Sequence, residues 1–202
     1  MGKTIQIIAL LAYLSEKKNI WGPHLILTPS AILQHWKSHF ETFCPSLKII
    51  PYWGAINERK TLRKMWKSGH GVHREDSPSH VILTSYLVLQ ADEKYFNDME
   101  WQCVVFDEAH VVASSNSLRW KKMLAMKCKS RMLLTGNPIS NNVDKLGGLL
   151  QCIVPSMVEK FKKDLLFEEW ELGEEEFERV YIMLKPYVLR RLKKDVESEF
   201  SL

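Results

Sequence analysis

The stretch "CVVFDEAH" (residues 103–110) decides the fold expected for this chain. Four apolar residues are followed directly by two acids, Asp107 and Glu108. A short apolar run of this kind is typical of a strand that is buried on both faces of a parallel sheet. The two acids would then lie at the carboxyl end of the strand, where open α/β sheets bind their ligands.

Strands alternate with helices along most of the chain, which predicts an α/β fold with a parallel sheet flanked by helices. Further strands are expected at 24–29, 47–54, 81–86 and 131–138. Helices are expected at 4–15, 56–67, 87–96, 117–126 and 142–152. A further helix is expected directly after Pro29, with Ser30 as its cap. Beyond 157 the pattern is helical, first acidic and then basic. Trp36 has the helical spacing of a core residue.

The composition is that of an ordinary globular chain of 202 residues, with 46% hydrophobic and 26% charged residues. No apolar run reaches the ~18 residues of a membrane span, so no membrane partner is expected. Neither the spacing of the four cysteines nor that of His70 and His73 is typical of a zinc site. We expect reduced thiols in or near the core and two solvated histidines.

The net charge of +4 is mild, but basic residues gather at 59–67, 121–131 and 190–194. An acidic stretch, 168–178, lies between the last two. Basic clusters are usually solvated faces, although a basic surface on one side favours nucleic acid. The acidic stretch is either a solvated helix face or a surface for a partner.

The residues "GKT" (2–4) precede the first expected helix. The amino end of a helix has unpaired N–H groups and a partial positive charge, which suit a phosphate. There Gly2 lets a phosphate approach, Lys3 can reach the β and γ phosphates, and Thr4 can offer its hydroxyl to Mg²⁺. Asp107 suits Mg²⁺, and Glu108 can orient an attacking water.

Three polar clusters follow expected strands: Thr28–Pro29, Asp107–Glu108 and Thr135–Gly136–Asn137. Parallel strands end at one edge of their sheet, so these clusters should lie along one rim. The amino end of the 4–15 helix is expected at the same rim. The sequence therefore predicts a site for a triphosphate and Mg²⁺ there.

The motifs "GKTIQ" (2–6), "DEAH" (107–110), "LLTGNPISNN" (133–142) and "LKPYVLRRLKKDVE" (184–197) occur in the order found in one family. The chain resembles the Swi/Snf-type ATPases of helicase superfamily two, the motors of chromatin remodellers. The inositol-requiring (INO-type) branch is the closer match. That match rests on "PSAILQHW" (29–36), "FCPSLKIIPYWG" (43–54), "TSYLVLQADEKYF" (84–96) and "SLRWKKML" (117–124).

The resemblance implies a first RecA-like (P-loop NTPase) lobe that binds ATP and one side of a DNA duplex. It implies that Lys3 and Thr4 bind the phosphates and Mg²⁺, that Asp107 holds the metal, and that Glu108 positions the water. The residues implied to couple nucleotide to DNA are His110, Thr135, Gly136 and Asn137. Those in the segments implied to grip the DNA backbone are Thr28, Pro29, Ser30, Thr84, Ser85 and Tyr86.

The sequence also departs from the family. The family has further glycines and a central strand before Gly-Lys-Thr, whereas Met1 alone precedes Gly2 here. A family threonine is Asn137, and a family glutamine is Ser140. We expect an incomplete lobe over 1–155, without its N-terminal strand and therefore poorly folded, and a helical extension over 156–202 that leads towards a second lobe. These 202 residues alone should lack useful ATP turnover.

The function expected from this resemblance is that of an ATP-dependent DNA translocase in chromatin remodelling, DNA repair and transcription. It would work in the nucleus on double-stranded DNA or nucleosomes, with the subunits of a remodeller complex. One alternative is a non-catalytic module that binds DNA or a partner protein. Another is a different P-loop enzyme such as a nucleotide kinase, which the four ordered motifs argue against.

Overall fold

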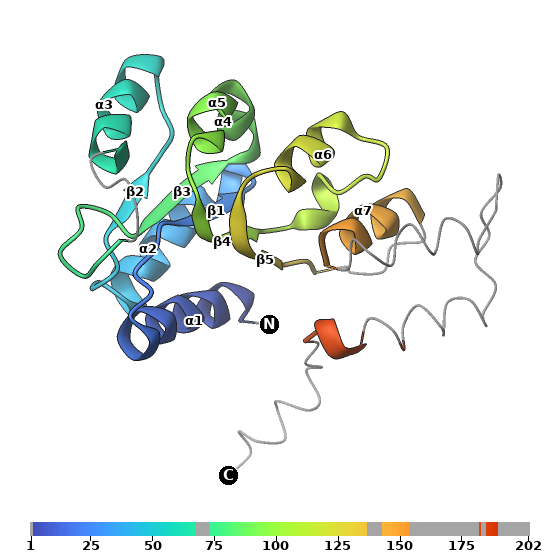
Figure 1. The fold of residues 1–202 in the computed structure, drawn as a ribbon, viewed down its shortest axis with the longest axis horizontal. Helices are drawn as coiled ribbons and strands as arrows, with labels where there is room; N and C mark the ends of the chain where they lie inside the picture. Colours follow the sequence, from blue (N-terminus) through green and yellow to red (C-terminus); the bar gives the residue numbers. More distant parts are fainter. Residues whose placement is uncertain (1, 68–72, 137–142, 154–181, 183–184, 190–202) are drawn as a thin grey trace, which may run out of the picture. The chain divides into compact units, whose positions relative to one another are not determined.

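The computed structural model describes residues 2–67, 73–136, 143–153, 182 and 185–189 (Figure 1). The chain divides into two units, one of residues 2–152 and one of residue 1 with residues 153–202. Within the described part of the second unit lies one short element, the 3-10 helix η3 (Lys185–Tyr187). The acidic stretch 168–178 and the basic cluster 190–194 lie outside the described residues.

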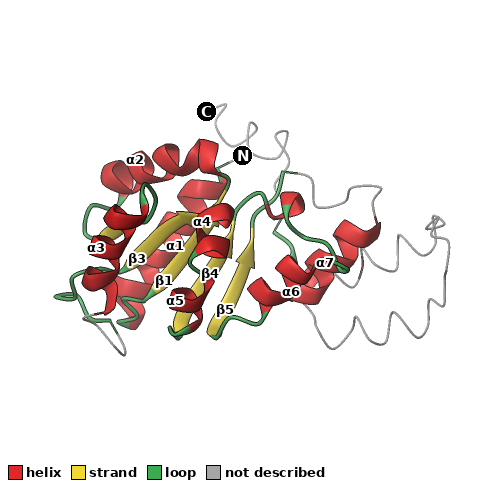
Figure 2. Cartoon of the chain, turned by 90° about the horizontal axis from the view of Figure 1, so that it is seen from above, coloured by secondary structure: helices red, strands yellow, loops and turns green. Residues whose placement is uncertain are grey.

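The described residues of the first unit form a five-stranded sheet in the order β2-β3-β1-β4-β5. Figure 2 shows β3, β1, β4 and β5 side by side. All four pairings are parallel, which confirms the predicted α/β fold. The strands are β1 (His24–Thr28), β2 (Ile49–Pro51), β3 (Val81–Ser85), β4 (Trp101–Phe106) and β5 (Cys128–Leu133). At one edge, β5 is half-buried or exposed along its length, whereas every residue of β1 and β3 is buried.

Helices cover both faces of the sheet, as Figure 1 shows with α1 below it and α3 to α6 above. On one face, α1 (Lys3–Lys18) and α2 (Leu33–Phe43) pack on strand residues such as Ile26 and Val105. The other face has a core that includes Leu25 and Phe106. It is covered by α3 (Ile56–Lys67), α4 (Tyr86–Ala91), α5 (Glu93–Asn97), α6 (Leu118–Leu124) and α7 (Val143–Ile153). Successive strand residues point to opposite faces, so covering both produces continuous apolar strands.

Several element boundaries differ from the prediction; for example, β2 covers only Ile49–Pro51 of the expected 47–54. The last strand begins at Cys128 and ends at Leu133, earlier than the expected 131–138. The expected helix over 87–96 is divided into α4 and α5 at Asp92, whose backbone is not helical. Ser30 begins a short 3-10 helix, η1 (Ser30–Ile32), and α2 starts at Leu33 without a side-chain cap, so the predicted capping role of Ser30 is wrong.

The buried carboxylate of Asp92 ties α3 to the junction of α4 and α5. It lies 2.8 Å from Arg59 Nε and 3.1 Å from Arg63 Nη1, and it accepts a hydrogen bond from the Tyr52 hydroxyl. Burial and the bond to Asp92 raise the pKa of Tyr52 to about 12. Two of the basic residues in the 59–67 cluster therefore point inward, while Lys60 and Lys64 are exposed.

A group of histidines lies at the amino end of the sheet. His73 is 2% exposed, and its Nδ1 lies 2.6 Å from the carbonyl oxygen of Ser79, so the prediction that it is solvated is wrong. The reason is that its backbone N–H donates to Gly22, just before β1, which draws the loop against the sheet. His70 lies outside the described residues. Burial lowers the pKa of His24 to about 4 and lowers that of His80 as well.

The four thiols are free, with Cys128 half-buried and the other three buried, as the sequence predicts. Among the described residues, none of the helices has the length and apolar character of a membrane span.

We expect Asp92→Ala to lower the free energy of unfolding by about 3 kcal/mol, because it leaves two nearly buried guanidinium groups without a counter-charge. The neighbouring Glu93→Ala is the matched control, since it removes an exposed ion pair with Lys122. That change should cost less than about 1 kcal/mol. Urea unfolding of both variants provides the measurement, and equal losses would contradict a structural role for Asp92.

Acidification should destabilise the fold through His24. Its folded-state pKa of about 4 lies below its unfolded value of 6.5, so the unfolded chain takes up a proton first. Stability that is present above pH 6.5 is therefore lost between pH 6.5 and pH 4, by about 3 kcal/mol. In His24→Gln the slope of stability against pH should flatten in this window, whereas His35→Gln, at an exposed position, should retain it. Equal slopes in thermal unfolding series would rule out His24 as the cause.

Candidate functional site

An ammonium group and a carboxylate from distant parts of the chain meet at the carboxyl rim of the sheet. Lys3 Nζ, at the start of α1, lies 2.9 Å from Glu108 Oε1, just after β4. Both side chains are about one-third exposed, at 33% and 30%. Gly2 precedes the helix with φ 76°, and the first turn of α1 has neither a side-chain cap nor an acid. The structure therefore brings Lys3, the lysine predicted to bind phosphate, to Glu108, one of the two acids predicted at the same rim.

Glu108 has a backbone conformation that is uncommon outside glycine, with φ 47° and ψ 45°. Its Oε2 lies 3.4 Å from His110 Nδ1 and accepts a 3.5 Å hydrogen bond from the backbone N–H of Gly136. Burial would raise the pKa of Glu108, but the hydrogen bond and positive charge of Lys3 outweigh burial and lower it. Unusual backbone geometry of this kind is concentrated at functional sites, and here it aims an ionised carboxylate at Lys3.

Asp107 lies deeper than Glu108, at 4% exposure. Its Oδ2 accepts hydrogen bonds from Trp36 Nε1 at 2.6 Å and from Thr28 Oγ1 at 3.1 Å. Its backbone carbonyl accepts a third, from the hydroxyl of Tyr86 at 2.7 Å. The neighbouring acids Asp107 and Glu108 therefore differ in environment, one held by neutral donors and the other by a cation.

The residues expected to couple nucleotide to DNA gather beside Glu108. His110 Nδ1 lies 3.1 Å from Thr135 Oγ1, and Gly136 contacts Glu108 as described above. These contacts connect the segment after β5 to the acids after β4. Asn137 lies outside the described residues.

The side chains expected in the DNA-gripping turns are largely internal. The four buried ones, Thr28, Thr84, Ser85 and Tyr86, are each at most 5% exposed. Thr84 Oγ1 donates to the carbonyl of Tyr52, and Ser85 Oγ caps α4 by accepting from the N–H of Val88. Ser30 is exposed and Pro29 is half-buried. A ligand at these turns would therefore meet Ser30, Pro29 and backbone groups.

The polar role of Trp36 was not predicted from the sequence. Its helical spacing predicted burial, and it is fully buried, but its indole N–H also reaches Asp107. Apolar periodicity identifies the buried face of a helix and contains no signal for the partner of one buried N–H.

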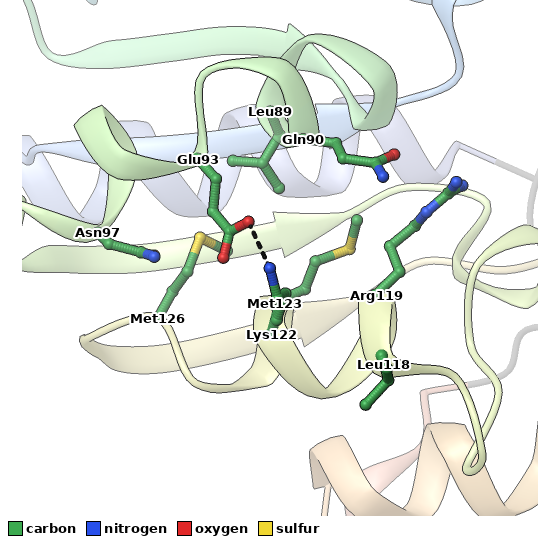
Figure 3. A pocket seen from close by; sticks show the side chains of 9 residues that line it. All are labelled: Leu89, Gln90, Glu93, Asn97, Leu118, Arg119, Lys122, Met123 and Met126. Atoms are coloured by element: carbon green, nitrogen blue, oxygen red, sulfur yellow. Dashed lines mark hydrogen bonds and ion pairs between the residues drawn. The ribbon is translucent and has the colours of Figure 1, made fainter.

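A separate groove of about 250 Å³ lies between the α4–α5 pair and α6, and Figure 3 shows its lining side chains. Leu89, Met123 and Met126 supply apolar surface, and Glu93 forms a 3.0 Å ion pair with Lys122. None of the predicted phosphate-site residues is in its described lining.

The groups at the rim fit a magnesium nucleotide by their chemistry. Lys3 and the uncapped helix start suit phosphate oxygens. Thr4, half-buried in the first turn of α1, supplies a hydroxyl, and Asp107 and Glu108 supply the hard carboxylate oxygens that Mg²⁺ prefers.

Comparison with protein families and with curated proteins gives one consistent result. The SNF2-related domain family matches residues 1–202. The chain is 44% identical over 211 aligned residues to the chromatin-remodeling ATPase INO80 of Debaryomyces hansenii and 42% identical over 214 to that of Schizosaccharomyces pombe. The whole chain is covered in both comparisons, but it spans only 16% and 13% of those relatives.

Solved structures give the same assignment. The SWI2/SNF2 ATPase core of Sulfolobus solfataricus in complex with dsDNA superposes with a TM-score of 0.73 at 28% identity, over 97% of this chain and 39% of that one. The ATPase core domain alone gives 0.70 at 26% identity, over 96% and 38%. These neighbours confirm the predicted RecA-like fold. The chain therefore belongs to the SNF2-related domain family.

Proposed function

We propose that this chain is part of the motor of an ATP-dependent DNA translocase that remodels chromatin. The observation that carries the proposal is the 2.9 Å contact between Lys3 and Glu108, which are 105 residues apart. It unites the predicted phosphate-binding lysine with the predicted water-positioning acid. The identity with INO80 ATPases over the whole chain supports the same assignment.

In this proposal each group at the rim has one task. Lys3 and the N–H groups after Gly2 bind the phosphates of ATP, while Thr4 and Asp107 serve Mg²⁺. Bound Mg²⁺ neutralises phosphate charge as phosphoryl transfer proceeds. Glu108 accepts a hydrogen bond from the attacking water and orients it. Before nucleotide binds, the ion pair holds both Lys3 and Glu108 in place, so nucleotide entry exchanges Glu108 for phosphate as the partner of Lys3.

The partners proposed from the resemblance are double-stranded DNA or a nucleosome and the subunits of a remodeller complex in the nucleus. His110, Thr135, Gly136 and Asn137 would couple the nucleotide to DNA. Contact with DNA phosphates through the turns at 28–30 and 84–86 would be independent of sequence and sensitive to salt. Residues 1–155 form the ATPase lobe in this proposal, and 156–202 lead towards the second lobe.

A second candidate is a non-catalytic module that binds DNA or a protein. The observation that favours it is the same ion pair, because Lys3 and Glu108 satisfy each other without nucleotide. In a non-catalytic module the pair would stay closed, and the surface of the lobe would be its functional part.

We expect Lys3→Ala to weaken binding of Mg²⁺-ATP at least tenfold, since it removes the ammonium that meets the phosphates. DNA affinity should not change. The control is Lys17→Ala, which removes the same charge from an exposed position on the same helix. Titration with a fluorescent ATP analogue measures the first effect and DNA anisotropy the second. DNA binding without measurable ATP binding in the unaltered protein would favour the non-catalytic module.

A polypeptide of residues 1–202 should hydrolyse ATP far more slowly than about one per second, even with DNA. In the family the second lobe supplies an arginine to the transition state, and such an arginine is worth ~10³–10⁵ in rate. Phosphate release in the presence of duplex DNA is the measurement. Turnover near one per second would contradict this division of labour between two lobes.

A further inference from the structure

The two oxygens of the Asp107 carboxylate are engaged unequally. Oδ2 accepts both the Trp36 indole N–H and the Thr28 hydroxyl, while Oδ1 accepts the backbone N–H of Glu108 at 2.9 Å. A carboxylate offers about four lone-pair sites. The described contacts use two of these sites on Oδ2 and one on Oδ1. The acceptor site left over therefore belongs to Oδ1.

Both side-chain donors to Oδ2 come from the segment that runs from β1 into α2. Thr28 ends β1, Trp36 lies on α2, and both are 0% exposed. The parallel register pairs Leu27 with Phe106, which sets Thr28 beside Asp107. The buried Trp36 ring packs against Phe40, with ring centroids 6.2 Å apart.

Asp107 depends on these donors more than Glu108 does on its hydrogen bonds. Glu108 has the Lys3 ammonium beside it, whereas the described ion pairs include none with Asp107. A buried carboxylate without a counter-ion keeps its orientation through hydrogen bonds.

We propose that Trp36 and Thr28 are positioning residues for the nucleotide site. They fix the plane of the Asp107 carboxylate and occupy Oδ2, so that Oδ1 is the oxygen that serves Mg²⁺. The inference rests on the proposed function, in which Asp107 serves Mg²⁺. Thr28 and Trp36 lie on either side of the turn at 29–30. A displacement of this turn would therefore move the two donors that hold the Asp107 carboxylate.

The test measures how nucleotide binding by this protein depends on the concentration of Mg²⁺. Trp36→Phe removes the indole N–H and keeps an aromatic ring, while Thr28→Val removes the hydroxyl and keeps the shape. The readout is the Mg²⁺ concentration that gives half-maximal binding of a non-hydrolysable fluorescent ATP analogue. Each variant should raise this concentration by about tenfold, because loss of a hydrogen bond that orients a metal-ligating group commonly weakens metal binding by that amount. Binding of the analogue in EDTA should not change.

Two control variants separate positioning from packing. Thr28→Ser keeps a hydroxyl and should restore the Mg²⁺ dependence of the unaltered protein. Trp120 is also 0% exposed and donates its indole N–H, at 2.8 Å, to the carbonyl of Gly148 instead of to Asp107. Trp120→Phe should therefore lower the melting temperature without changing the Mg²⁺ dependence.

Each outcome decides something. If Trp36→Phe and Thr28→Val lower only the melting temperature, as Trp120→Phe does, the positioning role is wrong and the proposed function stands. If Trp36→Phe fails to fold, the Thr28→Val and Thr28→Ser pair decides alone, and equal Mg²⁺ dependence in the two variants overturns the role of the donors. If the unaltered protein binds no nucleotide at any Mg²⁺ concentration, the proposed function fails and the positioning role fails with it.

Discussion

The parallel pairing of β1 with β4 is the constraint on which the site depends. The register from His24 with Cys103 to Leu27 with Phe106 ends both strands at one level, so Thr28 and Asp107 become neighbours. Pairing of β5 on the other side of β4 brings the segment with Gly136 to the same edge. The start of α1 reaches this edge because Ile7, Ile8 and Leu11 pack against the sheet. A shift of one residue in either pairing would turn the strand's side chains to the wrong face and separate these groups.

The two neighbouring acids illustrate how environment separates chemical tasks. Asp107 is buried and held by neutral donors, which suits a fixed ligand position. Glu108 is partly exposed and has a lowered pKa next to Lys3, which suits a group that exchanges partners when a phosphate arrives. Carboxylates that are adjacent in sequence can differ in this way because their backbone conformations differ, and Glu108 adopts a left-handed one. In many active sites, neighbouring carboxylates take different chemical roles because their environments differ.

The positions of basic residues along the sequence did not predict which of them face solvent, whereas the order of motifs did predict the family. The cluster at 59–67 was expected to be a solvated face, yet Arg59 and Arg63 turn inward to Asp92 and hold α3 against the rest of the fold. The sequence shows the sign of each charge but not its direction, because a helix presents its residues to core and solvent in turn. The same limit explains His73, which lies in a stretch of loop composition and is nevertheless buried.

Much of the fold was determined by the sequence itself. Apolar runs and helical periodicity are local properties, so they located five strands and most helices to within a few residues, and the order of motifs identified the family. Parallel topology then predicted which clusters share a rim. Only the tertiary structure decided which polar atoms meet there: Lys3 with Glu108, Trp36 and Thr28 with Asp107, and Tyr86 with the backbone after β4. Those contacts join residues that are 21 to 105 positions apart, and they depend on how the elements pack across the sheet. Hydrophobic periodicity is a local property and does not encode such pairings.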